Sequence, residues 1–267
     1  MLISYHNHTK WSDGAPTLEE QLAQAHRLGL DEFGLSDHYT MYPGGEPVTW
    51  SMPLDFLDDY VEQLQQTRDR KKGMIVRVGI EADFFPETVD ILRDTLAQHP
   101  FDYIIGSVHF LNSFPVDEDR RLWRELTDEE VNDRWIRYWQ RITEMAESGV
   151  FDFAAHLDLP KKFGFRPTAD LTDLSNTALD AIKASDMAIE INTSGWSQSA
   201  EESYPSLTLL KAAQAREIPL LINSDAHSPA HIIRNYDRAR ELADEAGYKQ
   251  LVGYNKRERF TFPLSEK

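Results

Sequence analysis

The sequence predicts a single-domain α/β protein in which seven parallel strands close into a (β/α)7 barrel. Seven short apolar segments alternate with seven segments of helical periodicity along the 267 residues, which is typical of parallel sheets with right-handed crossovers. Each apolar segment ends in histidine, acidic or amide side chains. In a barrel all strand carboxyl ends meet at one mouth, whereas in an open sheet only those at the switch point meet. Seven polar strand ends therefore favour one barrel over residues 1–267.

The first half of the chain supplies four of these strands. After the first strand, Thr17 and Glu20 have the spacing of a capping box, and Leu18, Leu22 and Ala25 would share one face of the helix that follows. The predicted strands are 2–8, 32–35, 75–80 and 103–108, and the predicted helices are about 17–29, 55–72 and 87–98.

The second half supplies the other three strands. Thr127 and Glu130 repeat the capping-box spacing. Ser228 and Pro229 follow the last apolar run and are typical of a helix start. The predicted strands are 153–155, 187–191 and a seventh from 220, with a short strand at 260–262; the predicted helices are about 127–148, 170–185, one from 204–206 onward, and 229–245.

Three long loops, 39–54, 110–126 and 196–203, should emerge on the side of the polar strand ends. They are long enough to cover a small ligand. Tyr42, Trp50, Phe114 and Trp196 are candidates to form the wall of a site for an imidazole or another ring. The alternative is that each of these aromatic side chains packs its loop onto the barrel.

The composition excludes several classes of function. The formal net charge is −17, with 45 acidic and 28 basic residues, and a field of this sign disfavours extended nucleic-acid binding. The chain has no cysteine, which excludes disulfides and thiolate metal sites and fits a reducing cytoplasm. The segment 1–6 has no basic or long apolar stretch, so we expect neither a signal peptide nor a membrane span.

Nine titratable side chains lie at or near the predicted strand ends. Asp225 and His227 are two residues apart, so on an extended chain they would face the same pocket, about 7 Å apart at the base. Imidazoles and carboxylates without thiols suit zinc, manganese or iron. A single histidine at a strand end is usually structural, but core histidines have no reason to share one rim. The candidate metal ligands are His6, His8, Asp13, His38, Glu81, His109, His156, Asp225 and His227.

Other acids and histidines lie near these candidates. Asp37, Asp83 and Asp158 are next to, or two residues from, a candidate ligand. They can orient imidazoles, or they can cap helices. Among the remaining histidines, we keep only His231 as an outside candidate because it lies close to the seventh strand end.

The motifs, in this order, resemble the polymerase-and-histidinol-phosphatase (PHP) superfamily over essentially the whole chain. The segments 105–110 and 156–163 resemble its histidinol-phosphatase branch in particular. The resemblance implies a distorted TIM-like (β/α)7 barrel that holds three metal ions. The motifs are His6-x-His8, Asp13, Ser36-Asp37-His38, Gly79-x-Glu81, Gly106-Ser107-x-His109, His156 and Asp225-x-His227.

The resemblance also implies how the ligands divide among three divalent ions. Asp13 stands where the family often has histidine, which makes the third site harder. Three divalent ions and three carboxylates would give the site a net charge of about +3. Such a site would attract a phosphate monoester dianion even though the protein as a whole is acidic. Water between two ions would be ionised near neutral pH and would attack phosphorus. The implied sets are His6, His8, Glu81 and Asp225; then Glu81, His109 and His156; then Asp13, His38 and His227.

Candidate catalytic residues are therefore Glu81, which would bridge two ions, Asp225 and His227. Asp225, Asp158 and His231 are the possible proton donors to the leaving group.

Candidate substrate contacts lie on the loops after the fifth and sixth strands. Lys161, Lys162 and Arg166 can bind phosphate, and the fork of Arg166 matches phosphate oxygens best. The alternative for each is a solvated surface position. Trp196 is the candidate ring contact. The loop 196–203 carries no basic residue, although relatives often have one there.

We therefore expect a metal-dependent phosphomonoesterase that converts L-histidinol phosphate to histidinol and inorganic phosphate in histidine biosynthesis. The reaction class follows from the site, and the substrate follows from the resemblance alone. The alternatives are a nucleotide or nucleic-acid phosphoesterase of the same superfamily, a C–N amidohydrolase, and a metal-bound sensor without turnover. An amidohydrolase would be expected to have eight strands and often a bridging lysine.

Overall fold

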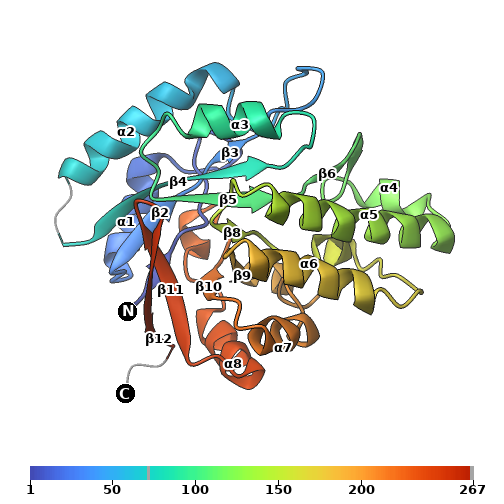
Figure 1. Ribbon diagram of the computed structural model, residues 1–267. Coiled ribbons are helices and arrows are strands. Elements are labelled where there is room, and N and C mark those ends of the chain that lie inside the picture. Colours follow the sequence, from blue (N-terminus) through green and yellow to red (C-terminus); the bar gives the residue numbers. More distant parts are fainter. Residues whose placement is uncertain (71–72, 265–267) are drawn as a thin grey trace.

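Seven parallel strands form the centre of the computed structural model, which describes residues 1–70 and 73–264. Each strand is hydrogen-bonded to the next in this order, as predicted (Figure 1). The strands are β1 (Ile3–Ser4), β2 (Glu32–Leu35), β4 (Ile75–Asp83), β5 (Tyr103–Ser107), β8 (Phe153–Ala154), β9 (Ala188–Asn192) and β10 (Leu220–Asn223). The predicted TIM-like (β/α)7 barrel is confirmed.

The barrel closes between its first and last strands. Asn7 and Ala226 form a parallel bridge, in which the His8 amide donates to the Ala226 carbonyl at 3.0 Å. Below this bridge the Tyr5 amide donates to the Asn223 side chain at 2.8 Å instead of to a backbone carbonyl. The strand predicted at 2–8 is therefore regular only over β1, and His6 and His8 follow it.

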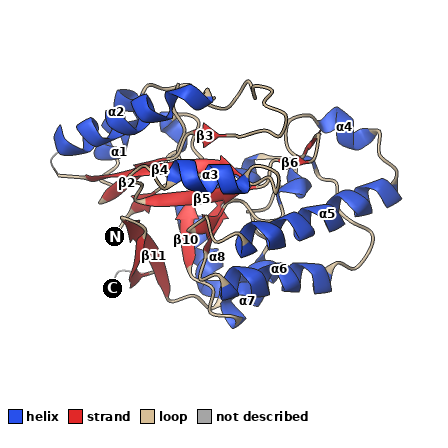
Figure 2. Cartoon of the chain, turned by 45° about the horizontal axis from the view of Figure 1, so that its top comes forward, coloured by secondary structure: helices blue, strands red, loops and turns tan. Residues whose placement is uncertain are grey.

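Helices surround the strands on the outside (Figure 2). Both predicted capping boxes are present: the Thr17 hydroxyl accepts from the Glu20 amide, and the Thr127 hydroxyl accepts from the Glu130 amide. No helix in the described residues is both long and apolar enough to cross a membrane. The helices are α1 (Leu18–Arg27), α2 (Leu57–Arg70), α3 (Val89–Leu96), α5 (Asp128–Glu147), α6 (Thr172–Ala184), α7 (Leu207–Ala215) and α8 (Tyr236–Ala246). The last two residues predicted for the helix 55–72 lie outside the described residues.

Tyr103 fills the barrel interior. Its ring stacks on that of Tyr5, with 4.8 Å between centroids, and its hydroxyl donates to the Leu35 carbonyl at 3.2 Å. Gly34 and Gly79 leave the necessary space, because a Cβ at either position would lie 2.2 Å or 2.1 Å from Tyr103 atoms. The barrel is therefore packed with side chains.

The long loops and the chain end contain more structure than predicted. The loop 39–54 follows β3 (His38–Tyr39), which pairs with β4. Further short elements are η1 (Leu54–Phe56), η2 (Leu159–Phe163), η3 (Thr193–Ser197), η4 (Pro229–His231), α4 (Arg120–Arg124) and the hairpin of β6 (Phe110–Leu111) and β7 (Phe114–Pro115).

The chain end is an antiparallel hairpin of β11 (Gln250–Asn255) and β12 (Glu258–Pro263), where only a strand at 260–262 was predicted. Arg257 binds the carboxylate of Asp152, and its amide donates to the Asp102 carbonyl. Both acids directly precede barrel strands, so the hairpin covers the amino-terminal end of the barrel and leaves the carboxyl end open.

The helix predicted over 229–245 is wrong in its first part. Ser228 does not cap a helix, and η4 is a single 3-10 turn. Asn235 has the left-handed φ of 59°, which interrupts any continuous helix, and α8 begins only at Tyr236. The segment 228–235 is therefore a loop beside the barrel mouth.

Candidate metal centre

A cavity of about 420 Å³ opens at the carboxyl ends of the strands. All nine candidate ligands lie at it or directly beneath it, in groups whose donor atoms are within 4.8 Å of one another. Six of them line the cavity: Asp13, His38, His109, His156, Asp225 and His227. The other three, His6, His8 and Glu81, are buried below.

Glu81, near the end of β4, lies at the centre of the group. The strand register places His38 directly beside it, and its Oε2 is 2.9 Å from His38 Nδ1 and 3.0 Å from His6 Nε2. Its Oε1 is 3.1 Å from His156 Nε2 and 3.7 Å from His109 Nε2. One carboxylate thus faces imidazoles from four strand ends, as a bridging ligand would.

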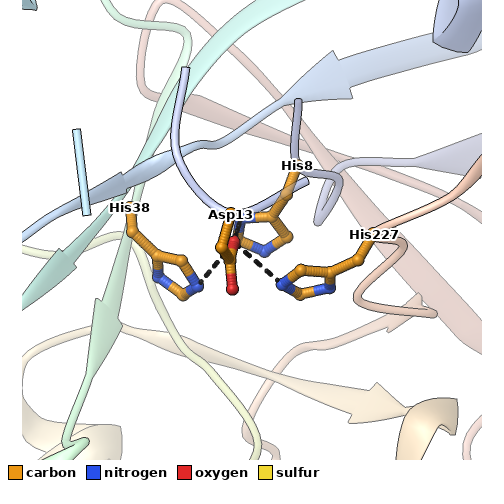
Figure 3. A group of neighbouring side chains, drawn as sticks. All are labelled: His8, Asp13, His38 and His227. Atoms are coloured by element: carbon orange, nitrogen blue, oxygen red, sulfur yellow. Dashed lines mark ion pairs between the residues drawn. The ribbon is translucent and has the colours of Figure 1, made fainter. Parts of the chain in front are cut away.

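A second group is formed around Asp13, whose carboxylate lies between His38 and His227 (Figure 3). Asp13 Oδ1 is 3.1 Å from His227 Nε2, 3.7 Å from His38 Nε2 and 4.0 Å from His8 Nδ1. The family resemblance implies Asp13, His38 and His227 as the ligands of one ion. The structure places His8 within the same group. Asp225 Oδ1 connects the two groups, at 3.1 Å from His8 Nε2.

Several of these atoms are buried without a hydrogen-bond partner. Leaving such polar atoms unsatisfied is costly, and divalent cations among them would supply the missing partners. Imidazole nitrogens and carboxylate oxygens without sulfur are suitable ligands for zinc or manganese. The clusters therefore fit metal ions. The atoms without a hydrogen bond are His6 Nε2, both ring nitrogens of His8, His38 Nδ1, Glu81 Oε2 and Asp225 Oδ1.

The pKa shifts of two central side chains, His8 and Glu81, suit metal ligands. Burial, followed by the nearby His227 and His38, lowers the pKa of His8 to about 3, so His8 is a neutral imidazole. Burial alone would raise the pKa of Glu81, but His6 and His38 hold it well below its usual value. Glu81 is therefore ionised, as a ligand must be.

Glu190, in β9, is a functional residue that the sequence analysis missed. It is fully buried, and its two carboxylate oxygens lie 3.0 and 3.1 Å from His6 Nδ1. It also accepts from the His156 amide at 3.0 Å and from the Asn192 and Asn223 amide groups at 2.8 and 2.9 Å. Glu190 therefore fixes His6 and His156 in place. The available signal was an acid inside an apolar strand, since a buried charge needs partners.

The three acids next to candidate ligands have different roles. Asp83 accepts from His109, with 3.0 Å between Asp83 Oδ1 and His109 Nδ1. Of the two roles left open by the sequence, Asp83 therefore orients an imidazole and does not cap a helix. Burial would lower the pKa of His109, but Asp83 raises it to about 10. Asp37 instead accepts from the amide and hydroxyl of Thr9 at 2.7 and 2.9 Å, which holds the loop of Asp13. Asp158 does not line the cavity. Among the described residues its partners are Lys161 and the Ser206 amide, and no imidazole.

The predicted substrate contacts are divided by the structure. Lys162 lines the cavity, where its Nζ lies 3.0 Å from Asp117 Oδ2. Lys161 does not: its buried Nζ donates to Asp158 at 2.9 Å, to Glu202 at 2.9 Å and to the Ser203 carbonyl at 2.7 Å. All three of its protons are used, so the expectation of a phosphate contact there is wrong.

Arg166 and Trp196 also lie outside the cavity lining. Arg166 binds Glu202 at 3.0 Å with its side chain half exposed. Trp196 stacks under Arg238, with 4.4 Å from the guanidinium carbon to the ring centroid. The structure therefore does not bring Arg166 or Trp196 to the cavity, where the sequence analysis expected substrate contacts.

Other side chains line the cavity in their place. Arg234, from the loop 228–235, lines it, and its Nε is buried without a partner. Trp50 lines it as predicted for a wall residue, edge-on to His38 at 4.8 Å and to His109 at 5.4 Å between ring centroids. Tyr42 and Phe114 do not line it. The remaining lining residues are Asp117, Glu118, Leu159, Ser194, Gln198, Tyr204 and His231.

Comparison with known proteins identifies the family. Residues 4–194 match the PHP domain model. The chain is 34% identical to a probable histidinol-phosphatase of Deinococcus radiodurans, over 92% of this chain and 94% of the relative. It is 23% identical to a probable histidinol-phosphatase of Schizosaccharomyces pombe, over 94% and 89%. In fold it is similar to the histidinol phosphate phosphatase of Lactococcus lactis, solved with zinc, L-histidinol and phosphate (TM-score 0.79, 20% identity, 97% and 98% covered). The predicted resemblance is therefore confirmed, and the chain belongs to the PHP domain family.

Proposed function

We propose that this protein is a metal-dependent phosphomonoesterase that hydrolyses L-histidinol phosphate to L-histidinol and inorganic phosphate in histidine biosynthesis. The observation that carries the proposal is the group of buried imidazole and carboxylate atoms, without hydrogen bonds, at the floor of an open cavity. The relatives named histidinol-phosphatase, which match over nearly the whole chain, support the choice of substrate.

The nine side chains would hold three divalent ions, such as zinc, manganese or iron. Bound ions would supply positive charge for a phosphate dianion and Lewis-acid activation of water. Glu81 would be a ligand of two of the ions because one of its oxygens faces His38 and the other faces His156. Asp225 lies between the groups, and His227 lines the open cavity. These positions are the support for Glu81, Asp225 and His227 as catalytic residues.

Two cations beyond the metal ligands are placed to bind phosphate. Lys162 and Arg234 both line the cavity. Arg234 is half buried, donates to the Ser224 carbonyl at 3.1 Å and keeps its Nε free. A guanidinium group that lines a cavity is suited to phosphate oxygens. Arg234 therefore takes the role that we expected of Arg166.

The test is phosphate release by purified protein loaded with zinc or manganese. We expect kcat/KM for L-histidinol phosphate to exceed that for β-glycerophosphate and p-nitrophenyl phosphate by at least about a hundredfold, as selective sites do. A Glu241→Gln variant, changed on an exposed face of α8, is the control and should match the wild type. Equal rates on all three esters would contradict the substrate assignment.

The alternatives predict different outcomes. A nuclease would cleave single-stranded DNA or a phosphodiester, and the net charge of −17 disfavours this polyanion. An amidohydrolase would release no phosphate. A sensor would bind metal without turnover. We also propose a cytoplasmic location, which the absence of cysteine supports.

A further inference from the structure

The cavity wall carries charges that the metal centre does not explain. Lys162 and Asp117 form an ion pair at 3.0 Å, so their charges balance. The other two charged wall residues, Arg234 and Glu118, form no ion pair among the residues that the structure describes. Beyond the metal ligands, the wall therefore offers one unpaired cation and one unpaired anion.

Glu118 is held in a defined place. Its Oε1 accepts a hydrogen bond of 2.5 Å from the Trp50 indole nitrogen. The Trp50 ring in turn lies edge-on against the ligands His38 and His109. Glu118 is thus one indole ring away from the metal centre, and the neutral indole leaves its negative charge uncompensated.

An unpaired carboxylate is unfavourable in a site that binds only phosphate esters. It repels the dianion and lowers the local potential that attracts it. The same charge is favourable when the substrate carries an ammonium group close to its phosphate, because a charge-assisted hydrogen bond then forms. A wall with one free cation and one free anion is complementary to such a zwitterionic substrate.

From this we infer that Glu118 is a specificity-determining residue that binds the ammonium group of an amino-alcohol phosphate, with Trp50 holding the carboxylate in position. This inference rests on the proposed function and adds to it the feature of the substrate that the site selects. Arg234 and the metal centre take the phosphate end, and Glu118 takes the amine.

The test compares Glu118→Gln with wild type on three esters. Glutamine keeps the size of the side chain and can still accept from Trp50, so the substitution removes only the charge. The esters are L-histidinol phosphate, its desamino analogue 3-(imidazol-4-yl)propyl phosphate, and 2-aminopropyl phosphate, which keeps the amine and lacks the imidazole. Glu125→Gln, an exposed acid just after α4, is the matched control.

We expect Glu118→Gln to lower kcat/KM about tenfold on both amine-bearing esters, the size of a charge-assisted hydrogen bond. On the desamino analogue kcat/KM should stay unchanged or rise slightly, because the repulsion of phosphate is gone. Glu125→Gln should match the wild type on all three. The melting temperature of each variant should equal that of the wild type, since neither side chain is buried.

Other results would overturn the inference in distinguishable ways. An equal loss on the desamino analogue would mean that the carboxylate binds the imidazole or acts on structure. No loss on the amine-bearing esters would remove Glu118 from recognition while leaving the phosphatase proposal intact. If wild-type, metal-loaded protein hydrolyses none of the three esters, the proposed function fails and this inference fails with it.

Discussion

Glu190 shows how a single buried residue can organise the site. Its carboxylate accepts from His6, His156, Asn192 and Asn223, and burial of an acid at this depth is tolerable only with such partners. When Glu190 accepts from His6 Nδ1, the other ring nitrogen of His6 is directed at Glu81. Acceptors of this kind fix the ring orientation of metal-bound histidines.

We therefore predict that Glu190→Gln weakens metal binding. A glutamine NH2 group would face donors in place of an acceptor, and His6 would lose its orientation. The expected loss in zinc affinity is about 10- to 100-fold, measured by competition with a chelator of known affinity. Glu241→Gln serves as the control. Unchanged zinc affinity in a folded Glu190→Gln protein would show that Glu190 does not position the ligands.

Lys161 and Lys162 are sequence neighbours with opposite environments. Lys161 is buried among Asp158, Glu202 and a carbonyl, whereas Lys162 lines the cavity. Lys161→Met should lower the free energy of unfolding by about 3–5 kcal/mol, because it leaves the buried Asp158 charge uncompensated. Lys162→Met should instead lower kcat/KM and cost less stability than Lys161→Met, because the Lys162–Asp117 ion pair is partly exposed at the cavity. Thermal unfolding and phosphate release measure the two effects, and the reverse assignment would contradict this account.

At this scale the sequence was informative about ligands and uninformative about their surroundings. His6, Glu81 and Asp225 were recognisable because each ends or follows an apolar strand. Whether Lys161 or Lys162 reaches the cavity depends on the direction of one turn of 3-10 helix, which no local pattern encodes. Glu190 was not predicted because the pattern of a strand shows where an acid lies but not which side chains contact it.

Among the elements, α5 has the clearest local cause. Thr127 and Glu130 form a reciprocal capping box at its start, which supplies partners for backbone donors that a helix start otherwise leaves free. The same device begins α1. Both helix starts were predicted from the sequence because the two residues of a capping box are only three positions apart.

We predict that Thr127→Ala lowers the melting temperature by about 2–4 °C near neutral pH. Hydrogen bonds from the Thr127 amide and hydroxyl lower the pKa of Glu130. The stabilisation is therefore present above the ordinary glutamate pKa of about 4.3, and it is lost as the pH falls through the lowered value. The difference between wild type and Thr127→Ala should narrow below about pH 4 in thermal scans. Thr177→Ala, an exposed change inside α6, should show no such pH dependence.

The failure at 229–245 has a physical reason at the same scale. Ser228 and Pro229 have the composition of a helix start, but the left-handed backbone at Asn235 delays α8 to Tyr236. That left-handed conformation depends on tertiary contacts. The consequence is functional, because the displaced segment brings Arg234 and His231 to the cavity.

For the molecule as a whole, the proposed metal ligands come from both ends of the chain. His6 and His8 follow β1, Asp225 and His227 follow β10, and backbone hydrogen bonds join the two ends in one barrel. The topology was predictable because every strand ends in polar side chains. The contact that closes the barrel could not be predicted, because it is made partly by the Asn223 side chain.

Metal ions bound at this junction should stabilise the whole fold, since the site exists only in the folded chain. Removing metal with a chelator should lower the melting temperature by several degrees, and zinc or manganese should restore it. His6→Ala should lose this dependence. His26→Ala, a change on the exposed face of α1, should keep it. A melting temperature that is indifferent to chelation in the wild type would contradict a metal centre in the barrel.

The most direct test of the metal centre is anomalous diffraction from crystals of zinc-loaded protein, collected on both sides of the zinc absorption edge. We predict anomalous peaks among the nine side chains, with at least one about 2.0–2.2 Å from a Glu81 oxygen, the usual zinc–carboxylate distance. A fully active crystal form with no peak at the barrel mouth, or with peaks only elsewhere, would contradict the account.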